Sequence, residues 1–254
     1  MTEQFLTIDG VGMSFGGVRA LDAVSFAVEP GAVVGLIGPN GSGKTTLLNV
    51  LSGVYKPTTG GVHFRGRSLA EVPAHAHCRL GIGRTFQVVK PFANLSVREN
   101  VVVGAMYGRE GARRSTRAAF AHADDVLVEV GLARVAQRPA SALTIADRKR
   151  LEVAKALAVD PELLLLDEVM AGLTPAEIDE ALVLLRTVHA RGVTLIVVEH
   201  VMQAIVSIST RVVVLAEGRK IADGSAAEVL AAPQVVEAYL GSRYAARRRR
   251  EPSA

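Results

Sequence analysis

The run Gly38-Pro39-Asn40-Gly41-Ser42-Gly43-Lys44-Thr45-Thr46 decides the fold of this chain. Its first eight residues match the phosphate-loop pattern G-x-x-x-x-G-K-[ST] without exception. Glycine lets the backbone curl until successive N–H groups face phosphate oxygens. The helix that follows directs the positive end of its dipole at the same oxygens. In this pattern Lys44 pairs with the β- and γ-phosphates of a nucleotide, and the Thr45 hydroxyl is a ligand for Mg²⁺.

The flanks of this run favour a phosphate-binding loop over a Gly-rich turn without a ligand. Residues 33–37 are apolar or glycine, which predicts a buried strand. Residues 47–52 predict a helix, and Gly53 can end it. A strand that enters the loop and a helix that leaves it are the context that this motif requires.

A second run, Leu163-Leu164-Leu165-Leu166-Asp167-Glu168, has the composition of the other half of a nucleotide site. Its four apolar residues predict a buried strand that presents Asp167 at its carboxyl end, where the carboxylate can hold Mg²⁺ directly or through water. Glu168 follows and can orient or deprotonate the attacking water. An acidic strand end can also cap a turn, but an intact phosphate loop in the same chain favours the nucleotide site.

The rest of the chain predicts an α/β protein. Aromatic residues make up only 4% and Trp is absent, so Val, Leu, Ile and Ala must build the core, as in parallel strands covered on both faces. Residues 5–8 and 24–28 alternate like antiparallel strands, and residues from about 70 to 140 contain helical stretches. We therefore predict a P-loop NTPase with a mostly parallel core sheet, an antiparallel β subdomain and an inserted α-helical subdomain.

Further elements follow the acidic pair. Residues 174–190 predict a helix with Thr174 as N-cap, Pro at the first position and Glu177 completing a capping box. Residues 194–198 predict a third buried strand, and residues 212–222 predict a hairpin with its turn at Glu217-Gly218.

Charge and hydropathy limit the classes of partner. The net charge of +4 comes from the residues after Gly241, where five Arg side chains accompany one Glu; the remaining body holds 24 basic and 24 acidic side chains. A neutral body predicts no nucleic-acid-binding face. The single cysteine fits a reducing compartment, and no apolar run approaches the about 18–20 residues that cross a bilayer. We expect a cytoplasmic chain with one ATPase domain over residues 1–242, a helical insert at about 88–158, and a basic, disordered tail at 243–254.

Two polar residues narrow the type of nucleotide site. Gln87 ends the run Arg84-Thr85-Phe86-Gln87, and His200 directly follows Val198-Glu199 at the end of a predicted strand. A polar side chain at the carboxyl edge of the sheet can reach a γ-phosphate bound over it. Either residue alone fits a structural role, but their order around the two halves of the site favours a function for both.

These motifs resemble those of the ATP-binding subunits of ABC transporters over essentially the whole chain. The resemblance implies that Phe15 stacks on adenine and that residues 38–46 bind the phosphates of ATP. It also implies that Gln87 senses the nucleotide and the membrane subunit, and that His200 contacts the γ-phosphate. The implied Mg²⁺ ligands are Thr45, Gln87 and Asp167, and the implied catalytic residues are Glu168, His200 and Gln87.

The subfamily that this chain resembles most is that of branched-chain amino acid importers. Four stretches carry this resemblance: Gly83-Arg84-Thr85-Phe86-Gln87, Asp167-Glu168-Val169-Met170-Ala171-Gly172-Leu173, Val198-Glu199-His200 and Val235-Val236-Glu237-Ala238-Tyr239-Leu240-Gly241.

The chain departs from the family in two places. The signature Leu-Ser-Gly-Gly-Gln, which contacts ATP bound to a partner ATPase subunit, aligns with Leu143-Thr144-Ile145-Ala146-Asp147. Thr144 keeps a hydroxyl, Ala146 replaces the second glycine, and Asp147 adds a negative charge near a phosphate. Thr144 and Ala146 are expected to contact that nucleotide. The usual Asp of the D-loop is replaced by Thr174, for which a role as helix cap is sufficient.

We expect the chain to bind and hydrolyse ATP with Mg²⁺ and to power an importer of branched-chain or other amino acids at the cytoplasmic face of the cell membrane. The expected partners are integral membrane permease subunits, which residues 87–94 would contact, and a second ATPase subunit, with a heterodimer favoured over a homodimer. An extracytoplasmic solute-binding protein is an indirect partner. The alternatives are a soluble ABC-type ATPase unrelated to transport, which the single ATPase half disfavours, and a nucleotide-binding regulator, which Glu168 and His200 disfavour.

Overall fold

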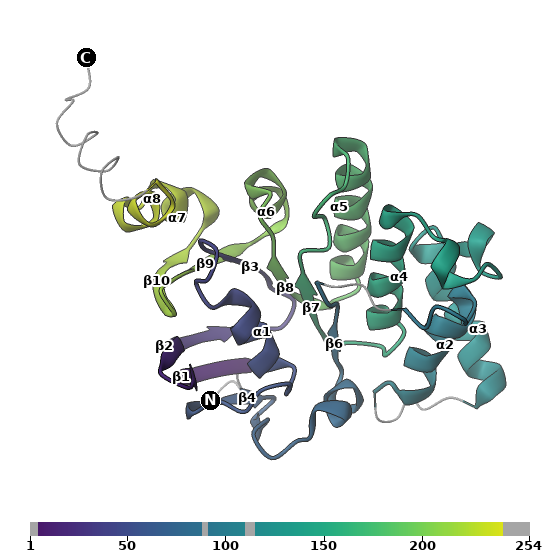
Figure 1. Cartoon of the computed structure of the whole chain (residues 1–254), viewed down its shortest axis with the longest axis horizontal. Helices are drawn as coiled ribbons and strands as arrows, with labels where there is room; N and C mark the ends of the chain where they lie inside the picture. Colours follow the sequence, from purple (N-terminus) through teal and green to yellow (C-terminus); the bar gives the residue numbers. More distant parts are fainter. Residues whose placement is uncertain (1–4, 88–90, 110–114, 241–254) are drawn as a thin grey trace. The chain divides into compact units, whose positions relative to one another are not determined.

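The computed structural model describes residues 5–87, 91–109 and 115–240 of the chain. This part of the chain forms two compact units (Figure 1). The first unit contains residues 5–71 and 205–240, and the second contains the described residues between 72 and 204. The phosphate loop belongs to the first unit, whereas Gln87, Asp167 and His200 belong to the second.

The first unit contains an antiparallel sheet with the strand order β2-β1-β4-β5. Its strands are β1 (Leu6–Phe15), β2 (Val18–Val28), β4 (Thr59–Phe64) and β5 (Arg67–Ser68). Phe5 and Phe64 pack edge to face, with ring centroids 5.0 Å apart. The predicted antiparallel strands are confirmed, and both are longer than predicted; the register of the pair shifts after Ile8, and the pairing continues beyond these irregularities.

Parallel pairing in the first unit begins with β3 (Val33–Ile37), whose residues are all buried. It pairs in parallel with β9 (Arg211–Ala216), which pairs in turn with antiparallel β10 (Arg219–Gly224). The predicted hairpin turn is confirmed: Glu217 and Gly218 have φ of 49° and 78°, the left-handed conformation that a tight hairpin needs. The helices of this unit are α1 (Lys44–Leu51), α7 (Ala226–Ala231) and α8 (Pro233–Leu240).

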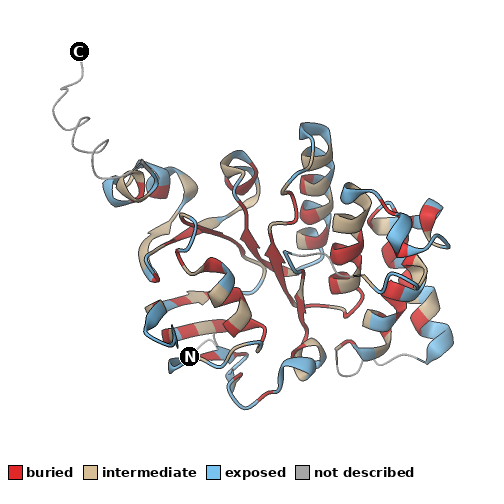
Figure 2. Cartoon of the chain, viewed as in Figure 1, coloured by how far each residue is buried: buried red, intermediate tan, exposed pale blue. Residues whose placement is uncertain are grey.

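The second unit is built on three parallel strands in the order β8-β7-β6. They are β6 (Ile82–Arg84), β7 (Leu163–Asp167) and β8 (Thr194–Val198). All residues of β7 and β8 are buried, which explains their continuous apolar sequence (Figure 2). Because these strands run in one direction, Asp167 lies opposite Val198 at their carboxyl ends.

Helices make up the rest of the second unit. They are α2 (Val97–Tyr107), α3 (Thr116–Glu129), α4 (Ile145–Leu157) and α5 (Pro175–Ala190), with 3₁₀ helices at Ala74–Leu80, Ala133–Val135 and Ala140–Ala142. Helix α6 (Met202–Ile208) connects the two units along the chain. The capping box predicted at the start of α5 is confirmed, since Thr174 Oγ1 accepts from the Glu177 N–H and Glu177 accepts from the Thr174 N–H.

The predicted fold class is confirmed, with parallel strands, an antiparallel sheet and a helical segment all present. Helices α2 to α4 lie between residues 88 and 158, although the boundaries of an inserted subdomain stay a prediction. The predicted tail, and residues 88–90 of the expected permease-contacting segment, lie outside the described residues. Within the described part of the chain, no helix combines the length and the hydropathy needed to span a membrane.

Candidate nucleotide-binding and catalytic site

The phosphate loop of the first unit is shaped by close backbone approaches that exclude a side chain. Gly38 has φ +152°, and a Cβ there would lie 2.1 Å from the Leu215 carbonyl oxygen. Gly43 has φ +103°, and a Cβ there would lie 2.6 Å from the Ala20 carbonyl oxygen. Both positions therefore require glycine for space as well as for conformation.

The ammonium group of Lys44 is enclosed by the loop. Lys44 is 6% exposed, and its Nζ donates to the Gly38 and Pro39 carbonyl oxygens at 2.7 and 2.9 Å. These acceptors are neutral, and an anionic phosphate oxygen makes a stronger hydrogen bond with an ammonium group. Thr45 is exposed at the start of α1, and Ser42 Oγ is buried with no hydrogen-bond partner among the described residues. The loop thus offers a cation, a hydroxyl and a helix N-terminus to a phosphate.

Two aromatic residues of the first unit are relevant to nucleotide binding at this loop. Phe15 ends β1 with its ring partly exposed and packs edge to face on Tyr55, with centroids 5.1 Å apart. An exposed ring is free to stack on a base, as expected for Phe15. Tyr239 of α8 has its pKa raised by burial, while a hydrogen bond from the Gly38 backbone opposes this effect. The sequence offered no signal that Tyr239 contacts the phosphate loop.

In the second unit, Asp167 lies buried at the carboxyl end of β7. Its backbone N–H donates to Thr85 Oγ1 at 3.0 Å, and its Oδ2 lies 3.4 Å from the Arg84 guanidinium. Its Oδ1 is buried with no hydrogen-bond partner in the described part of the chain. Burial raises the pKa of Asp167, Arg84 opposes this, and the charge of Glu168 adds to it. A cation near Oδ1 would relieve this cost of burial.

That unpartnered oxygen fits a Mg²⁺ ion, which prefers carboxylate, hydroxyl and amide oxygens as ligands. Asp167 supplies a carboxylate, Thr45 a hydroxyl and Gln87 an amide, so the chemistry of all three predicted ligands suits the ion. The roles of these residues stay predictions, because Thr45 belongs to the other unit.

Glu168 brings the predicted catalytic residues together. Gln87 Nε2 donates to Glu168 Oε2 at 2.8 Å, and His200 Nε2 lies 2.7 Å from Glu168 Oε1. Gln87 and His200 are exposed, whereas the Glu168 side chain is largely covered. A carboxylate with both oxygens oriented in this way can hold or deprotonate a water molecule. The structure thus assembles Gln87, Glu168 and His200, although their catalytic roles stay predictions.

Two residues next to this cluster were missed in the sequence. Glu199 is 2% exposed; its Oε1 accepts the Met170 N–H at 2.7 Å, and its Oε2 is buried without a partner among the described residues. Burial raises the pKa of Glu199 to about 7. Lys149 of α4 donates from Nζ to the Glu168 carbonyl oxygen at 2.7 Å. The sequence signal for Glu199 was a charged residue at the end of an apolar strand. Lys149 had no such signal, because it lies between two other basic residues.

The altered signature lies at the start of α4. Thr144 is the N-cap, and its Oγ1 accepts the Asp147 N–H at 3.1 Å. Asp147 stands in the first helical turn, where a negative charge suits the helix dipole. Thr144 and Ile145 are exposed, and Leu143 is buried. The N-terminus of α4 therefore presents its first residues to solvent, with the threonine hydroxyl engaged in its own helix.

The pKa of Glu199 predicts a pH dependence of stability. Its folded-state pKa of about 7 exceeds the ordinary value of 4.5, so the unfolded chain loses this proton first as the pH rises. The contribution of Glu199 to stability is therefore fully present below about pH 4.5 and is lost as the pH rises through about 7, by on the order of 3 kcal/mol. Urea unfolding of the wild type and of Glu199→Gln should show the wild type losing stability relative to the variant across this range. A difference that stays constant from about pH 4.5 to 7.5 would contradict the raised pKa.

Comparisons with known proteins identify the family. The family model described as "ABC transporter" matches residues 21–171, and that of the "Branched-chain amino acid ATP-binding cassette transporter" matches residues 219–245. The chain is 37% identical to the high-affinity branched-chain amino acid transport ATP-binding protein BraF of Pseudomonas aeruginosa, over 95% of this chain and 99% of BraF. It is 38% identical to the corresponding protein LivG of Salmonella typhimurium, again over 95% of this chain and 99% of the relative.

Solved structures agree with these matches. A nucleotide-free ATP-binding cassette from an ABC transporter superposes with a TM-score of 0.84 at 29% identity, covering 94% of this chain and 100% of the cassette. The ADP conformation of an ABC transporter cassette gives 0.83 at 29% identity, covering 95% and 100%. The family match spans the phosphate loop, Gln87, the altered signature and the Asp167-Glu168 pair. The chain therefore belongs to the ABC transporter family, as an ATP-binding and ATP-hydrolysing subunit.

Proposed function

We propose that this chain powers the import of branched-chain or other amino acids. The observation that supports the substrate class is its similarity, over nearly the whole length, to two ATP-binding proteins of high-affinity branched-chain amino acid transport. As a transporter subunit it acts with membrane permease subunits, at the cytoplasmic face of the membrane. An extracytoplasmic solute-binding protein would deliver the amino acid to those permeases.

In this proposal the two halves of the site act on one ATP. Residues 38–46 bind the phosphates, Lys44 exchanges the loop carbonyls for phosphate oxygens, and Phe15 stacks on adenine. Thr45, Asp167 and Gln87 would hold Mg²⁺, which neutralises phosphate charge when bound. The Gln87–Glu168–His200 cluster is the observation that supports hydrolysis, because Gln87 and His200 each hold one carboxylate oxygen of Glu168, and each oxygen keeps a further lone pair that can accept a water proton.

Substitutions at Glu168 and Lys44 separate hydrolysis from binding. Glu168→Gln keeps the size of the side chain but removes the base, so ATP binding should persist while kcat falls about 10²–10⁴-fold. Lys44→Ala removes the charge that pairs with the β- and γ-phosphates, so binding itself should weaken. Nucleotide titration and steady-state hydrolysis by the assembled transporter measure both effects. Hydrolysis at the normal rate by Glu168→Gln would disprove the role given to Glu168.

The segment after Gln87 is our proposed contact with the permease. Phe92 is 52% exposed. Contact between an apolar ring and water is unfavourable, so an exposed ring suits a contact with another protein. The backbone of Phe92 is held in place: the fully buried Asn100 accepts the Phe92 N–H at 2.8 Å and donates to the Phe92 carbonyl at 3.1 Å. A fixed backbone that presents an exposed ring suits a preformed contact with another protein.

Crosslinking tests this contact. In a Cys78→Ser background, Phe92→Cys should form a crosslink to a permease subunit in membranes, whereas Val183→Cys, on the exposed face of α5, should not. The readout is a shifted band that contains both subunits. If Phe92→Cys captures no permease while a cysteine elsewhere does, the proposed contact is wrong.

The altered signature leads us to propose a heterodimer with a different ATPase subunit. Ala146 adds a methyl group where glycine allows the closest approach to a phosphate, and Asp147 adds a negative charge. A homodimer would repeat both features at two sites, whereas a heterodimer confines them to the site that holds the partner's ATP. The phosphate loop and Glu168 of this chain would then face an ordinary signature on the partner.

Restoring the signature tests the asymmetry. The double variant Ala146→Gly, Asp147→Gln should change ATP turnover mainly at the partner's site. Turnover at each site is measured separately by disabling the catalytic glutamate of the other subunit. If the purified chain alone forms an ATP-dependent homodimer with full ATPase activity, the asymmetric arrangement is refuted.

A further inference from the structure

The backbone of Glu168 is in an unfavourable conformation. Its φ is +53°, in the left-handed region that is unfavourable for a residue with a side chain. Such a conformation persists only where the surroundings over-determine it, and it is characteristic of functional sites. The contacts that hold the Glu168 backbone are therefore candidates for a part in hydrolysis.

Hydrogen bonds hold this backbone and the turn that follows it. The Glu168 N–H donates to the Val198 carbonyl of β8 at 2.9 Å. The Glu168 carbonyl accepts from Lys149 Nζ at 2.7 Å and, over a longer distance of 3.4 Å, from the Ala171 N–H. The turn that follows is held by Glu199, which accepts the Met170 N–H. The Val198 contact comes from β8, the Glu199 contact comes from the residue that directly follows β8, and the Lys149 contact comes from α4, the helix that begins with the altered signature.

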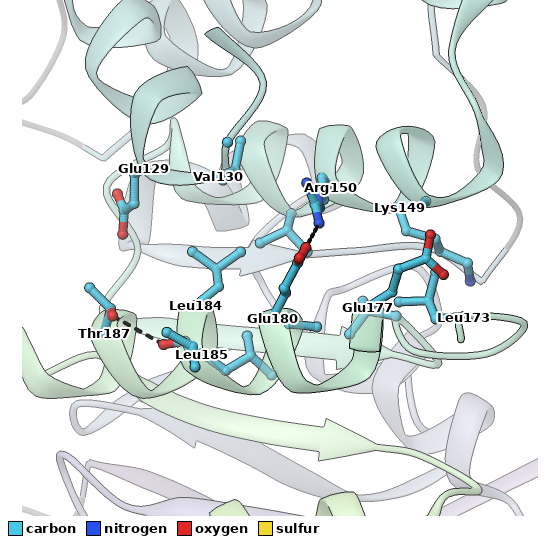
Figure 3. Close-up of a pocket in the computed structure, with 16 residues that line it drawn as sticks. Glu129, Val130, Lys149, Arg150, Leu173, Glu177, Glu180, Leu184, Leu185 and Thr187 are labelled. Atoms are coloured by element: carbon cyan, nitrogen blue, oxygen red, sulfur yellow. Dashed lines mark hydrogen bonds and ion pairs between the residues drawn. The ribbon is translucent and has the colours of Figure 1, made fainter. Parts of the chain in front are cut away.

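Lys149 is distinct from the basic residues beside it. Arg148 donates to the Ser141 carbonyl at 2.8 Å, and Arg150 pairs with the exposed Glu180 of α5. Figure 3 shows the Arg150–Glu180 pair across the pocket between α4 and α5, while Lys149 lies at the end of that pocket near Leu173, in the segment between β7 and α5. A surface pair such as Arg150–Glu180 contributes little to stability, whereas Lys149 is directed at the catalytic segment.

We propose that Lys149 is a positioning residue for Glu168. Its ammonium group ties the carbonyl of the catalytic residue to the second turn of the signature helix in the same chain. If α4 shifts when its N-terminus binds the partner's ATP, Lys149 transmits that shift to the backbone of Glu168, and so to hydrolysis at this chain's own site. The inference rests on the proposed role of Glu168 and on the proposed contact of the signature with the partner's nucleotide.

The positive charge of lysine strengthens the hydrogen bond between Lys149 and the Glu168 carbonyl. An ammonium group makes a charge-assisted hydrogen bond with a carbonyl, which is stronger than a neutral one. It also lies near the Glu199 carboxyl, whose pKa it lowers against the larger effect of burial. Lys149→Met keeps the length and apolar stem of the side chain and removes both the donor and the charge, whereas Lys149→Arg keeps both.

The test uses the assembled transporter with Lys149→Met, Lys149→Arg and the control Arg150→Met, each alone and combined with Glu168→Gln. We expect Lys149→Met to lower kcat about 10-fold or more while the KM for ATP and the Kd of a fluorescent ATP analogue change less than about 2-fold. Lys149→Arg should restore most of the rate, and Arg150→Met should match the wild type. In the Glu168→Gln background, Lys149→Met should have no further effect, because it acts through Glu168.

The outcomes separate this inference from the proposed function. Normal hydrolysis by Glu168→Gln alone would refute the role of Glu168 itself. If Glu168→Gln is slow but Lys149→Met retains its kcat, or if the two effects multiply in the double variant, only the inference about Lys149 is overturned. Parallel losses of ATP affinity and thermal stability in Lys149→Met, without rescue by Lys149→Arg, would show a structural role and overturn it as well. Should Lys149→Met fail to fold, Lys149→Leu likewise removes both the donor and the charge, and a wild-type kcat in that variant would overturn the inference.

Discussion

The polar cluster of the second unit depends on one residue, Glu168, held in a left-handed backbone conformation. This conformation turns the chain sharply at the end of β7, immediately after the buried Asp167. Because of that turn, the carboxylate of Glu168 meets Gln87 and His200, which come from distant parts of the sequence. The strain is tolerated because buried strands and the Lys149 ammonium group hold the backbone on both sides.

The phosphate loop also needs unusual backbone conformations, but it adopts them with glycine. It must aim backbone N–H groups at an anion, and it does so with glycines at Gly38 and Gly43, where any side chain would meet a carbonyl oxygen. Glu168 cannot be glycine, because its side chain carries the proposed chemistry, so it needs stabilising contacts that the glycines do not. At Glu168 these contacts include the Lys149 ammonium group, and Glu199 holds the turn that follows.

Motifs with a strict physical pattern could be predicted from the sequence. The phosphate loop, the apolar strand before Asp167 and the capping box at Thr174 each depend on neighbouring residues, and the structure contains all three elements. The contacts of Lys149 and Glu199 could not be predicted, because they depend on the packing of α4 and β8 beside β7. A lysine between two arginines has no spacing that distinguishes a positioning role from a solvated charge. The charge at the end of an apolar strand marks Glu199 but does not show what its side chain contacts.

The most direct test of this account is a crystal structure of the Glu168→Gln protein with ATP and Mg²⁺. The account predicts that Lys44 Nζ leaves the Gly38 and Pro39 carbonyls for the β- and γ-phosphates. It also predicts that Asp167 Oδ1 and the Thr45 hydroxyl face the metal ion, directly or through water, and that residue 168 keeps its left-handed φ with its carbonyl on Lys149. Bound nucleotide with Lys44 still on the loop carbonyls, and with Asp167 Oδ1 remote from the metal ion, would contradict it.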